Sequence, residues 1–288
     1  MLTAEPGSSA DFLTRIMAQG LTSGLGQQVV VDNRGSTGGI IAAHTVAGAL
    51  ADGYTLLSYS NTIWITPLLR RNVPYDPVKD LAPITLPVNS PLVLVVHPSV
   101  PVKSVTEVIE LAKSKPGALN YGSPGSGAPT QIAAELFKSM AGVNIVSVPY
   151  KGAGPALNAL MAAEVQLMFA TAGGAAMHTK AGRLRAVAVT SAQPSALLPG
   201  LPTVAASLPG YESIACYGIF APARTPAAII GRLNLEIVKV LNSAATKERL
   251  HSAGVEVVGS SPGQLMATMK SDMDKISKLI KTAGIRVE

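Results

Sequence analysis

The feature that most constrains the fold is a corner rich in glycine and hydroxyl residues that follows a strand-like run and opens a helix. The clearest corner is the stretch 119–130, which precedes apolar residues that repeat at helical spacing. Similar corners occur at four other places: Pro6–Asp11, Asn33–Gly39, Pro149–Pro155 and Thr171–Gly174. This alternation of strands and helices predicts an α/β fold with a largely parallel sheet, whose corners meet at the carboxyl edge where ligands bind.

These corners suit an anion. Glycine lets a backbone approach a ligand closely, and the open N–H groups at the start of a helix favour negative charge there. Ser8 and Asp11 also have the spacing of a capping box, which predicts that a helix begins next to Ser8. From the residues alone, a phosphate, a nucleotide and a carboxylate all remain open as ligands.

The composition excludes several classes of protein. Hydrophobic residues make up 48% of the 288 residues and charged residues 14%, which is typical of a globular protein with a large core. The net charge of +6 is spread along the chain, and aromatic residues are only 4%, so no basic platform for nucleic acid is predicted. The single cysteine, Cys216, excludes an intramolecular disulfide and any CxxC motif.

Membrane and export signals are also missing from the pattern. The longest apolar strand, Leu92–Val96, is far shorter than the roughly 20 residues that span a bilayer. Met1–Glu5 has neither a basic nor an apolar segment of a signal peptide. We therefore expect either a cytosolic protein or a sequence that begins after its export signal.

Two strands closed by proline, Leu92–Val96 and Tyr217–Ala221, bracket the middle of the chain. They predict a discontinuous two-lobed protein in which the chain crosses to a second lobe and returns. We place lobe one at 1–97 plus 222–288 and lobe two at 98–221, with hinge strands near 95–98 and 218–222.

Motifs for catalysis are scarce. The chain contains no HExxH zinc motif and no Walker loop, and its four histidines are far apart. We expect no metal and no cofactor. An enzyme such as a transferase or lyase, using His44 or Lys151 in the same crevice, remains an alternative, as does a sensor that signals through a partner protein.

The corners resemble a known family, the tripartite tricarboxylate transporter receptors, periplasmic solute-binding proteins also called Bug proteins. Pro6–Asp11 is similar to the family's Pro-Gly-Gly-x-x-Asp, and Asn33–Gly39 to its Asn-x-x-Gly-x-Gly-Gly. Further matches follow in order along the chain: Ala51–Leu57, Asn120–Gly127, Val148–Gly152, Gly154–Leu157 and Leu201–Thr203. The resemblance implies a two-lobed type II periplasmic-binding-protein fold, with a mainly parallel sheet flanked by helices in each lobe and a cleft between the lobes.

The resemblance also implies a function. It predicts a monomeric, non-enzymatic receptor that traps a small carboxylate or dicarboxylate between its lobes and delivers it transiently to a membrane permease. Carried over by position, the ligand-binding residues are Gly7, Ser8, Ser9, Ala10, Ser60, Asn61, Thr62, Ser123, Ser126, Gly127, Ala128, Thr130, Tyr150 and Thr171.

Three departures from the family pattern stand out. Ser8 replaces a glycine, and Thr130 stands where histidine is common. Only Met1–Glu5 precede the first corner, where the family has a signal peptide and a full strand. We therefore expect lobe one to lack part of a central strand.

Overall fold

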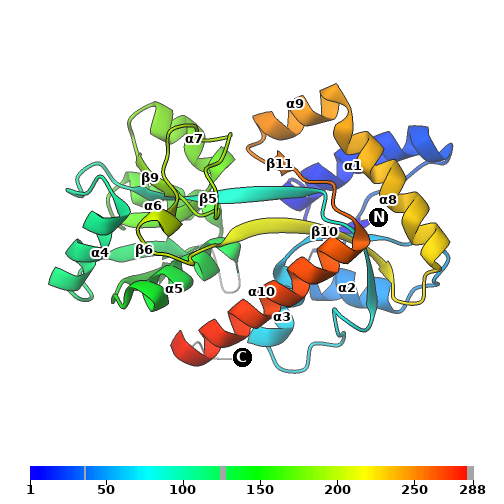
Figure 1. Cartoon of the computed structure of the whole chain (residues 1–288), viewed down its shortest axis with the longest axis horizontal. Coiled ribbons are helices and arrows are strands. Elements are labelled where there is room, and N and C mark those ends of the chain that lie inside the picture. The colour runs from blue at the N-terminus through cyan, green and yellow to red at the C-terminus, as the bar shows by residue number, and fades with distance from the viewer. Residues whose placement is uncertain (36, 124–127, 284–288) are drawn as a thin grey trace. The chain divides into compact units, whose positions relative to one another are not determined.

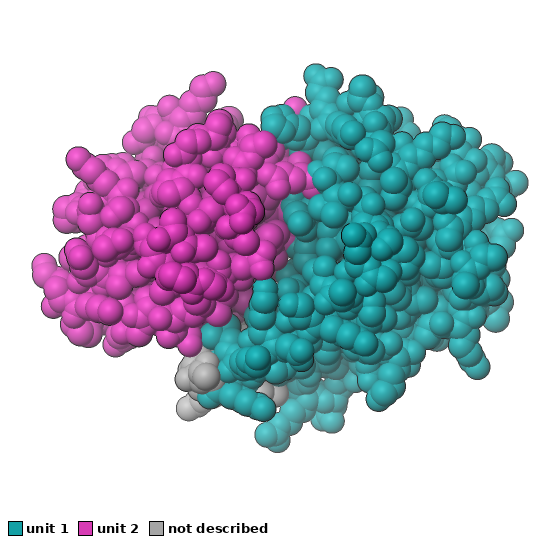
Figure 2. Space-filling model, in the orientation of Figure 1, with its two compact units in different colours: residues 1–89, 216–251, 257–288 teal, residues 90–215, 252–256 magenta. Residues whose placement is uncertain are grey.

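The computed structural model describes residues 1–35, 37–123 and 128–283 (Figure 1). The chain divides into two compact units, which Figure 2 colours separately. Unit 1 consists of Met1–Asn89, Cys216–His251 and Val257–Glu288, and unit 2 of Ser90–Ala215 and Ser252–Glu256. The chain changes unit within β5 (Val88–Val96) and within β10 (Ile214–Pro222), whereas we predicted hinges near 95–98 and 218–222. The change falls at Ser90 and Cys216 rather than at 97/98 and 221/222.

The sheet of unit 1 is built around a short first strand. β1 (Leu2–Thr3) pairs in parallel with β2 (Asp32–Asn33) on one side and with β3 (Leu57–Ser60) on the other. β10 then pairs antiparallel with both β3 and β4 (Leu81–Thr85). Although β1 has only two residues, it is paired on both sides.

Helices complete unit 1. The helical segments among its described residues are α1 (Ser9–Leu25), the 3-10 turn η1 (Thr37–Gly39), α2 (Ile40–Ala47), α3 (Thr62–Leu69), α8 (Ala227–Asn242), α9 (Ala244–Ser252) and α10 (Pro262–Ala283). α1 buries Leu13, Met17 and Leu21 at helical spacing and packs against α8. α10 packs against α3 and β4, and the buried Trp64 of α3 meets Phe220 of β10 edge to face.

Unit 2 has a sheet in the order β7 (Val146–Pro149), β6 (Asn120–Ser123), β8 (Leu167–Thr171) and β5, with β9 (Arg185–Val189) also on β5. β6 is parallel to both β7 and β8, whereas β5 is antiparallel to β8 and β9. Its helices are α4 (Val105–Ser114), α5 (Pro129–Ala141), α6 (Ala153–Met161), α7 (Ala172–Lys180) and the 3-10 turn η2 (Val204–Ala206). The predicted α/β architecture is confirmed, and the long strands add antiparallel pairs to it.

Both faces of β5 are buried, which explains its uninterrupted apolar sequence. Leu92, Leu94 and Val96 join one apolar cluster of unit 2, and the intervening Val93 and Val95 join a second cluster. Side chains of a strand alternate between its two faces, so a strand covered on both sides must be apolar at every position.

A short late segment also belongs to unit 2. Residues Ser252–Glu256 run from the last residue of α9 toward α10, and Glu256 begins β11 (Glu256–Val257). The buried Ser195 donates a hydrogen bond to Oε1 of Glu256 (2.5 Å). We predicted that all of 222–288 belongs to lobe one, so this segment is an addition that the sequence pattern did not indicate.

Within residues 1–35, 37–123 and 128–283, no helix has both the length and the apolar character needed to cross a membrane.

Candidate functional site

The corners of unit 1 lie at one edge of its sheet because β1 and β3 run parallel. α1 begins after β1, and α3 begins directly after β3, so both helices start at the carboxyl edge of these strands. The predicted residues Gly7, Ser8, Ser9 and Ala10 lie at the first start, and Ser60, Asn61 and Thr62 at the second.

The start of α1 leaves two amides open. Ser8 is the N-cap, and its hydroxyl accepts a hydrogen bond from the N–H of Asp11 (3.2 Å), as the capping-box spacing predicted. The N–H of Gly7 donates to Oδ2 of Asp11 (2.9 Å), and that of Ser8 to the carbonyl of Glu5 (3.2 Å). Among the described residues, the N–H groups of Ser9 and Ala10 have no acceptor. Of the four predicted residues at this corner, only Ser9 and Ala10 therefore have backbone N–H groups available to a ligand.

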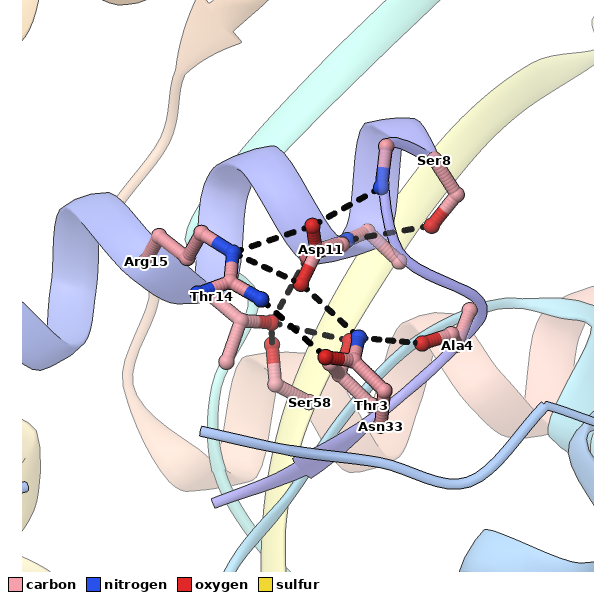
Figure 3. Close-up of polar contacts among 10 residues, drawn as sticks. Thr3, Ala4, Ser8, Asp11, Thr14, Arg15, Asn33 and Ser58 are labelled. Carbon is pink, nitrogen blue, oxygen red and sulfur yellow. Dashed lines mark hydrogen bonds and ion pairs between the residues drawn. The ribbon is translucent and has the colours of Figure 1, made fainter. Parts of the chain in front are cut away.

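The Asp11 carboxylate is the centre of a polar network below this turn (Figure 3). Nε of Arg15 lies 3.0 Å from both its oxygens, and Nδ2 of Asn33 donates to Oδ1 (2.8 Å) and also to the carbonyl of Ala4 (2.6 Å). Burial by itself raises the pKa of the Asp11 carboxyl, but the hydrogen bonds from Arg15, Asn33 and Gly7 lower that pKa below its usual value. Asp11 is therefore ionised at neutral pH.

A second, uncharged set of contacts ties α1 to the strands. The hydroxyl of Thr14 lies within hydrogen-bonding distance of the hydroxyls of Thr3 (3.0 Å) and Ser58 (2.8 Å), and it donates to the carbonyl of Ala10 (2.6 Å) (Figure 3). Thr3 and Thr14 are fully buried, and Ser58 is 1% exposed. The first turn of α1 is thus anchored to both β1 and β3.

The second corner of unit 1 is also rich in hydroxyls. Ser60 and Thr62 place their hydroxyl oxygens 2.9 Å apart, and the N–H of the buried Asn61 donates to the carbonyl of Cys216 (2.8 Å). Sequence reasoning missed Tyr217, which pairs with Ser60 across the sheet. Burial raises the pKa of Tyr217, and a hydrogen bond with Ser9 acts in the opposite direction. A tyrosine inside a long apolar strand gave no signal that it belongs to a corner.

Unit 2 brings its predicted residues to one edge in the same way. β6, β7 and β8 are parallel, so Ser123, Tyr150 and Thr171 all lie at or next to the carboxyl ends of neighbouring strands. The N–H of Tyr150 donates to the carbonyl of Ser123 (2.8 Å), which joins two of these positions directly.

The start of α5 is less satisfied than that of α1. Ala128 occupies the N-cap, where it has no side chain to accept a hydrogen bond, and Pro129 at the first helical position has no N–H to donate. Thr130 is 8% exposed, and among the described residues its hydroxyl oxygen has no hydrogen-bond partner. The predicted residues Ser126 and Gly127 lie outside the described residues.

At the start of α7, Thr171 acts as the N-cap. Its hydroxyl accepts a hydrogen bond from the N–H of Gly174 (3.2 Å). Gly173 and Gly254 meet backbone to backbone at this corner: a Cβ on Gly254 would lie 2.5 Å from the nitrogen of Gly173. Gly254 also has a φ of +74°, which favours glycine. The late segment 252–256 therefore packs directly onto a predicted ligand corner.

The alternative catalytic residues show no such convergence. His44 is exposed on α2, with Nδ1 2.9 Å from the carbonyl oxygen of Pro74, and Lys151 is exposed beside Tyr150. Within the described part of the chain, no three His, Cys, Asp or Glu side chains are grouped so that they could hold a metal ion.

Comparison with known proteins gives consistent matches. The family model described as "Tripartite tricarboxylate transporter family receptor" matches residues 13–285. The chain is 36% identical over 277 residues to the "UPF0065 protein in tcbD-tcbE intergenic region" of Pseudomonas sp. (strain P51), covering 96% of this chain and 82% of that protein.

Two solved structures with bound ligands are also similar. "R. palustris Rpa4515 with adipate" has a TM-score of 0.85 and 36% identity, over 99% of this chain and 97% of that one. "MatC (Rpa3494) from Rhodopseudomonas palustris with bound malate" has a TM-score of 0.81 and 26% identity, over 97% of each chain. The folds of both proteins extend over nearly the whole of this chain.

Proposed function

Because the chain belongs to the tripartite tricarboxylate transporter receptor family, we propose that it captures a small dicarboxylate and delivers it to a membrane permease of the tripartite tricarboxylate type. Receptors of this family are periplasmic, and we place this chain in the periplasm as part of the proposal. The binding donors are the N–H groups of Ser9 and Ala10 in unit 1, and the N–H and hydroxyl of Thr130 in unit 2.

The observation that carries the proposal is that each unit leaves donors open at the start of a helix. A helix start attracts a carboxylate by its aligned peptide dipoles, typically with about 0.3–1 kcal/mol when exposed and up to about 2 kcal/mol when partly buried. Each contribution is modest, so affinity needs several donors on one ligand. A dicarboxylate has two anionic ends and can therefore accept more such hydrogen bonds than a monocarboxylate.

The ligand class is supported by the solved relatives. One is described with adipate and the other with malate, and both ligands are small dicarboxylates. Neutral donors hold a carboxylate less tightly than a buried arginine would, and a transport receptor must release its ligand. This suits delivery to a permease.

A ligand screen tests the proposal. The purified chain is melted in the presence of adipate, malate and other dicarboxylates of different length, with phosphate and NAD as controls. A ligand at a hundredfold its dissociation constant stabilises the folded state by about 2.7 kcal/mol, which is a clear shift of the melting temperature. Stabilisation by dicarboxylates alone is the expected result; stabilisation by NAD alone, or by no carboxylate, would contradict the proposal.

One variant tests the donor in unit 1 without adding bulk. Ser9→Pro deletes the Ser9 N–H at the first helical position, which tolerates proline, and the preceding Ser8 already has the extended backbone that proline requires (ψ 162°). Loss of a hydrogen bond to a carboxylate should weaken binding about 10- to 100-fold. Ser9→Ala removes only the hydroxyl and separates its contribution.

Ala227→Pro is the matched control. It deletes the first N–H of α8, which follows an extended Pro226 (ψ 139°). β10 runs antiparallel to β3, so α8 begins at the opposite edge of the sheet of unit 1. Equal losses of affinity in Ser9→Pro and Ala227→Pro would show that the amide of Ser9 does not contact the ligand.

A further inference from the structure

The burial of Asp11 needs an explanation. Its side chain is 5% exposed and carries a charge, and a buried charge is costly unless it is paired and hydrogen-bonded. Its carboxylate has three partners: the N–H of Gly7, the guanidinium of Arg15 and the amide of Asn33. Those partners come from the turn before α1, from α1 itself and from β2, so a single carboxylate joins three segments.

The contact with Gly7 fixes how the turn enters the helix. In an ordinary capping box the acidic residue reaches back to the N–H of the N-cap residue. Here Asp11 reaches one residue further, to Gly7, which has a φ of +78°. The N–H of the N-cap, Ser8, is instead bonded to the carbonyl of Glu5. The amides of Gly7 and Ser8 are thus both engaged, and those of Ser9 and Ala10, which follow them, have no acceptor among the described residues.

We propose that Asp11 is a positioning residue of the carboxylate site: it holds the turn 6–8 so that the N–H groups of Ser9 and Ala10 stay open and aligned. The inference rests on the proposed function, because it assigns a role to a residue that does not itself contact the ligand.

Because Asp11 is charged, the two possible roles of this residue predict opposite changes in ligand affinity when the charge is removed. An ionised carboxylate near the start of α1 repels an anionic ligand, and only Arg15, half exposed, offsets it among the three partners. If the charge were the only influence, Asp11→Asn would strengthen the binding of a dicarboxylate. If Asp11 positions the turn, the same change weakens binding, since an amide cannot accept from both Gly7 and Asn33 as the two carboxylate oxygens do.

The experiment is calorimetric titration of adipate into the natural protein, Asp11→Asn and Asp11→Glu. We expect binding about tenfold weaker in both variants. Asp11→Glu keeps the charge and moves the carboxylate by one methylene, so it also covers a failure of Asp11→Asn to fold. Unchanged or tighter binding of adipate to a folded variant would overturn the inference.

Asp76→Asn is the matched control. Asp76 also lies in unit 1 and also accepts backbone hydrogen bonds, from the N–H groups of Val78 (2.9 Å) and Lys79 (3.2 Å), but it lies outside both corners. We expect this variant to bind adipate like the natural protein. An equal loss of affinity in Asp76→Asn would reduce Asp11 to a general contributor to stability, which contradicts the inference.

A readout without ligand separates this inference from the proposed function. Hydrogen exchange of the Gly7 amide, followed by NMR, should be slow in the natural protein and much faster in Asp11→Asn, while amides of unit 2 stay unchanged. If the natural protein binds neither adipate nor malate, the proposed function fails, and the exchange of Gly7 still decides the role of Asp11. Equal exchange rates in both proteins would refute it.

Discussion

The first turn of α1 in unit 1 and that of α5 in unit 2 are ordered by different means. At α1, a side chain caps the helix, a buried carboxylate holds the preceding turn, and Thr14 is bonded to two strands. At α5, alanine and proline occupy the cap and the first position, and the buried hydroxyl of Thr130 has no partner among the described residues. The α7 corner of unit 2 relies on glycine backbones in contact rather than on buried polar side chains.

The two corners therefore differ in whether their buried polar side chains have hydrogen-bond partners among the described residues. An unpaired hydroxyl in a buried position costs free energy, so a folded protein keeps one where something else can supply the partner. The α1 corner has satisfied its own side chains and offers only backbone donors. At the α5 corner the hydroxyl of Thr130 has no partner among the described residues, and we propose that it donates a hydrogen bond to the ligand.

The largest effect should come from breaking the glycine contact of unit 2. Gly254→Ala adds a methyl group 2.5 Å from the Gly173 nitrogen at a left-handed position, and we expect a loss of about 3 kcal/mol from overpacking and backbone strain together. Urea unfolding measures it. Gly182→Ala is the control, since Gly182 also has a positive φ (+69°) but an open surrounding. Similar losses in both variants would show that the contact itself contributes little.

Thr14→Val tests the satisfied corner. Valine has the shape of threonine but leaves the hydroxyls of Thr3 and Ser58 buried without this partner. We expect a loss of about 2 kcal/mol, since a buried unsatisfied polar group costs roughly 1–3 kcal/mol. A melting temperature equal to that of the natural protein would show that the network of α1 adds no stability.

Thr130→Val makes the same change in the unsatisfied corner and should have the opposite sign. Removing a hydroxyl without a partner should raise the stability of the ligand-free protein by about 1 kcal/mol. Adipate affinity should fall about tenfold, because the ligand loses a donor. Thermal melts with and without adipate measure both. A loss of stability without ligand would mean that Thr130 has a partner in the free protein.

The smallest effect concerns pH, and it should be confined to unit 1. The pKa of Asp11 is lower in the folded protein than in the unfolded chain, so its contribution to stability is complete above the unfolded pKa of about 3.9 and is lost as pH falls below it. Urea unfolding between pH 3 and pH 6 should therefore show a shallower dependence in Asp11→Asn. The first turn of α5 contains no acidic residue. An identical pH dependence in the variant would exclude Asp11 as a source of acid sensitivity.

Local patterns predicted much of this molecule. The predicted cap Ser8 is confirmed by the hydrogen bond that its hydroxyl accepts from the N–H of Asp11, three residues ahead. Such features depend on neighbours within one or two turns. The receptor family could be predicted because its motifs are short and follow in order along the chain, and the family model that matches residues 13–285 confirms it.

Long-range contacts limited the rest. The apolar run Val29–Val31 precedes a predicted corner, but β2 covers only Asp32–Asn33, because the pairing with the short β1 sets its extent and Val30 is 64% exposed. We did not predict α3, whose residues 63–66 are all buried and therefore show no helical periodicity. Nor could spacing reveal the role of Asp11, whose partner Asn33 is 22 residues away.

The discontinuous course of the chain has a consequence for its synthesis. β3 and β4 emerge from the ribosome early, yet their partner β10 begins only at Ile214. Unit 2 in turn waits for Glu256, the partner of Ser195, which follows after α8 and α9. A chain that ends at residue 215 therefore has neither unit complete, and both units can be completed only by segments from the last third of the sequence.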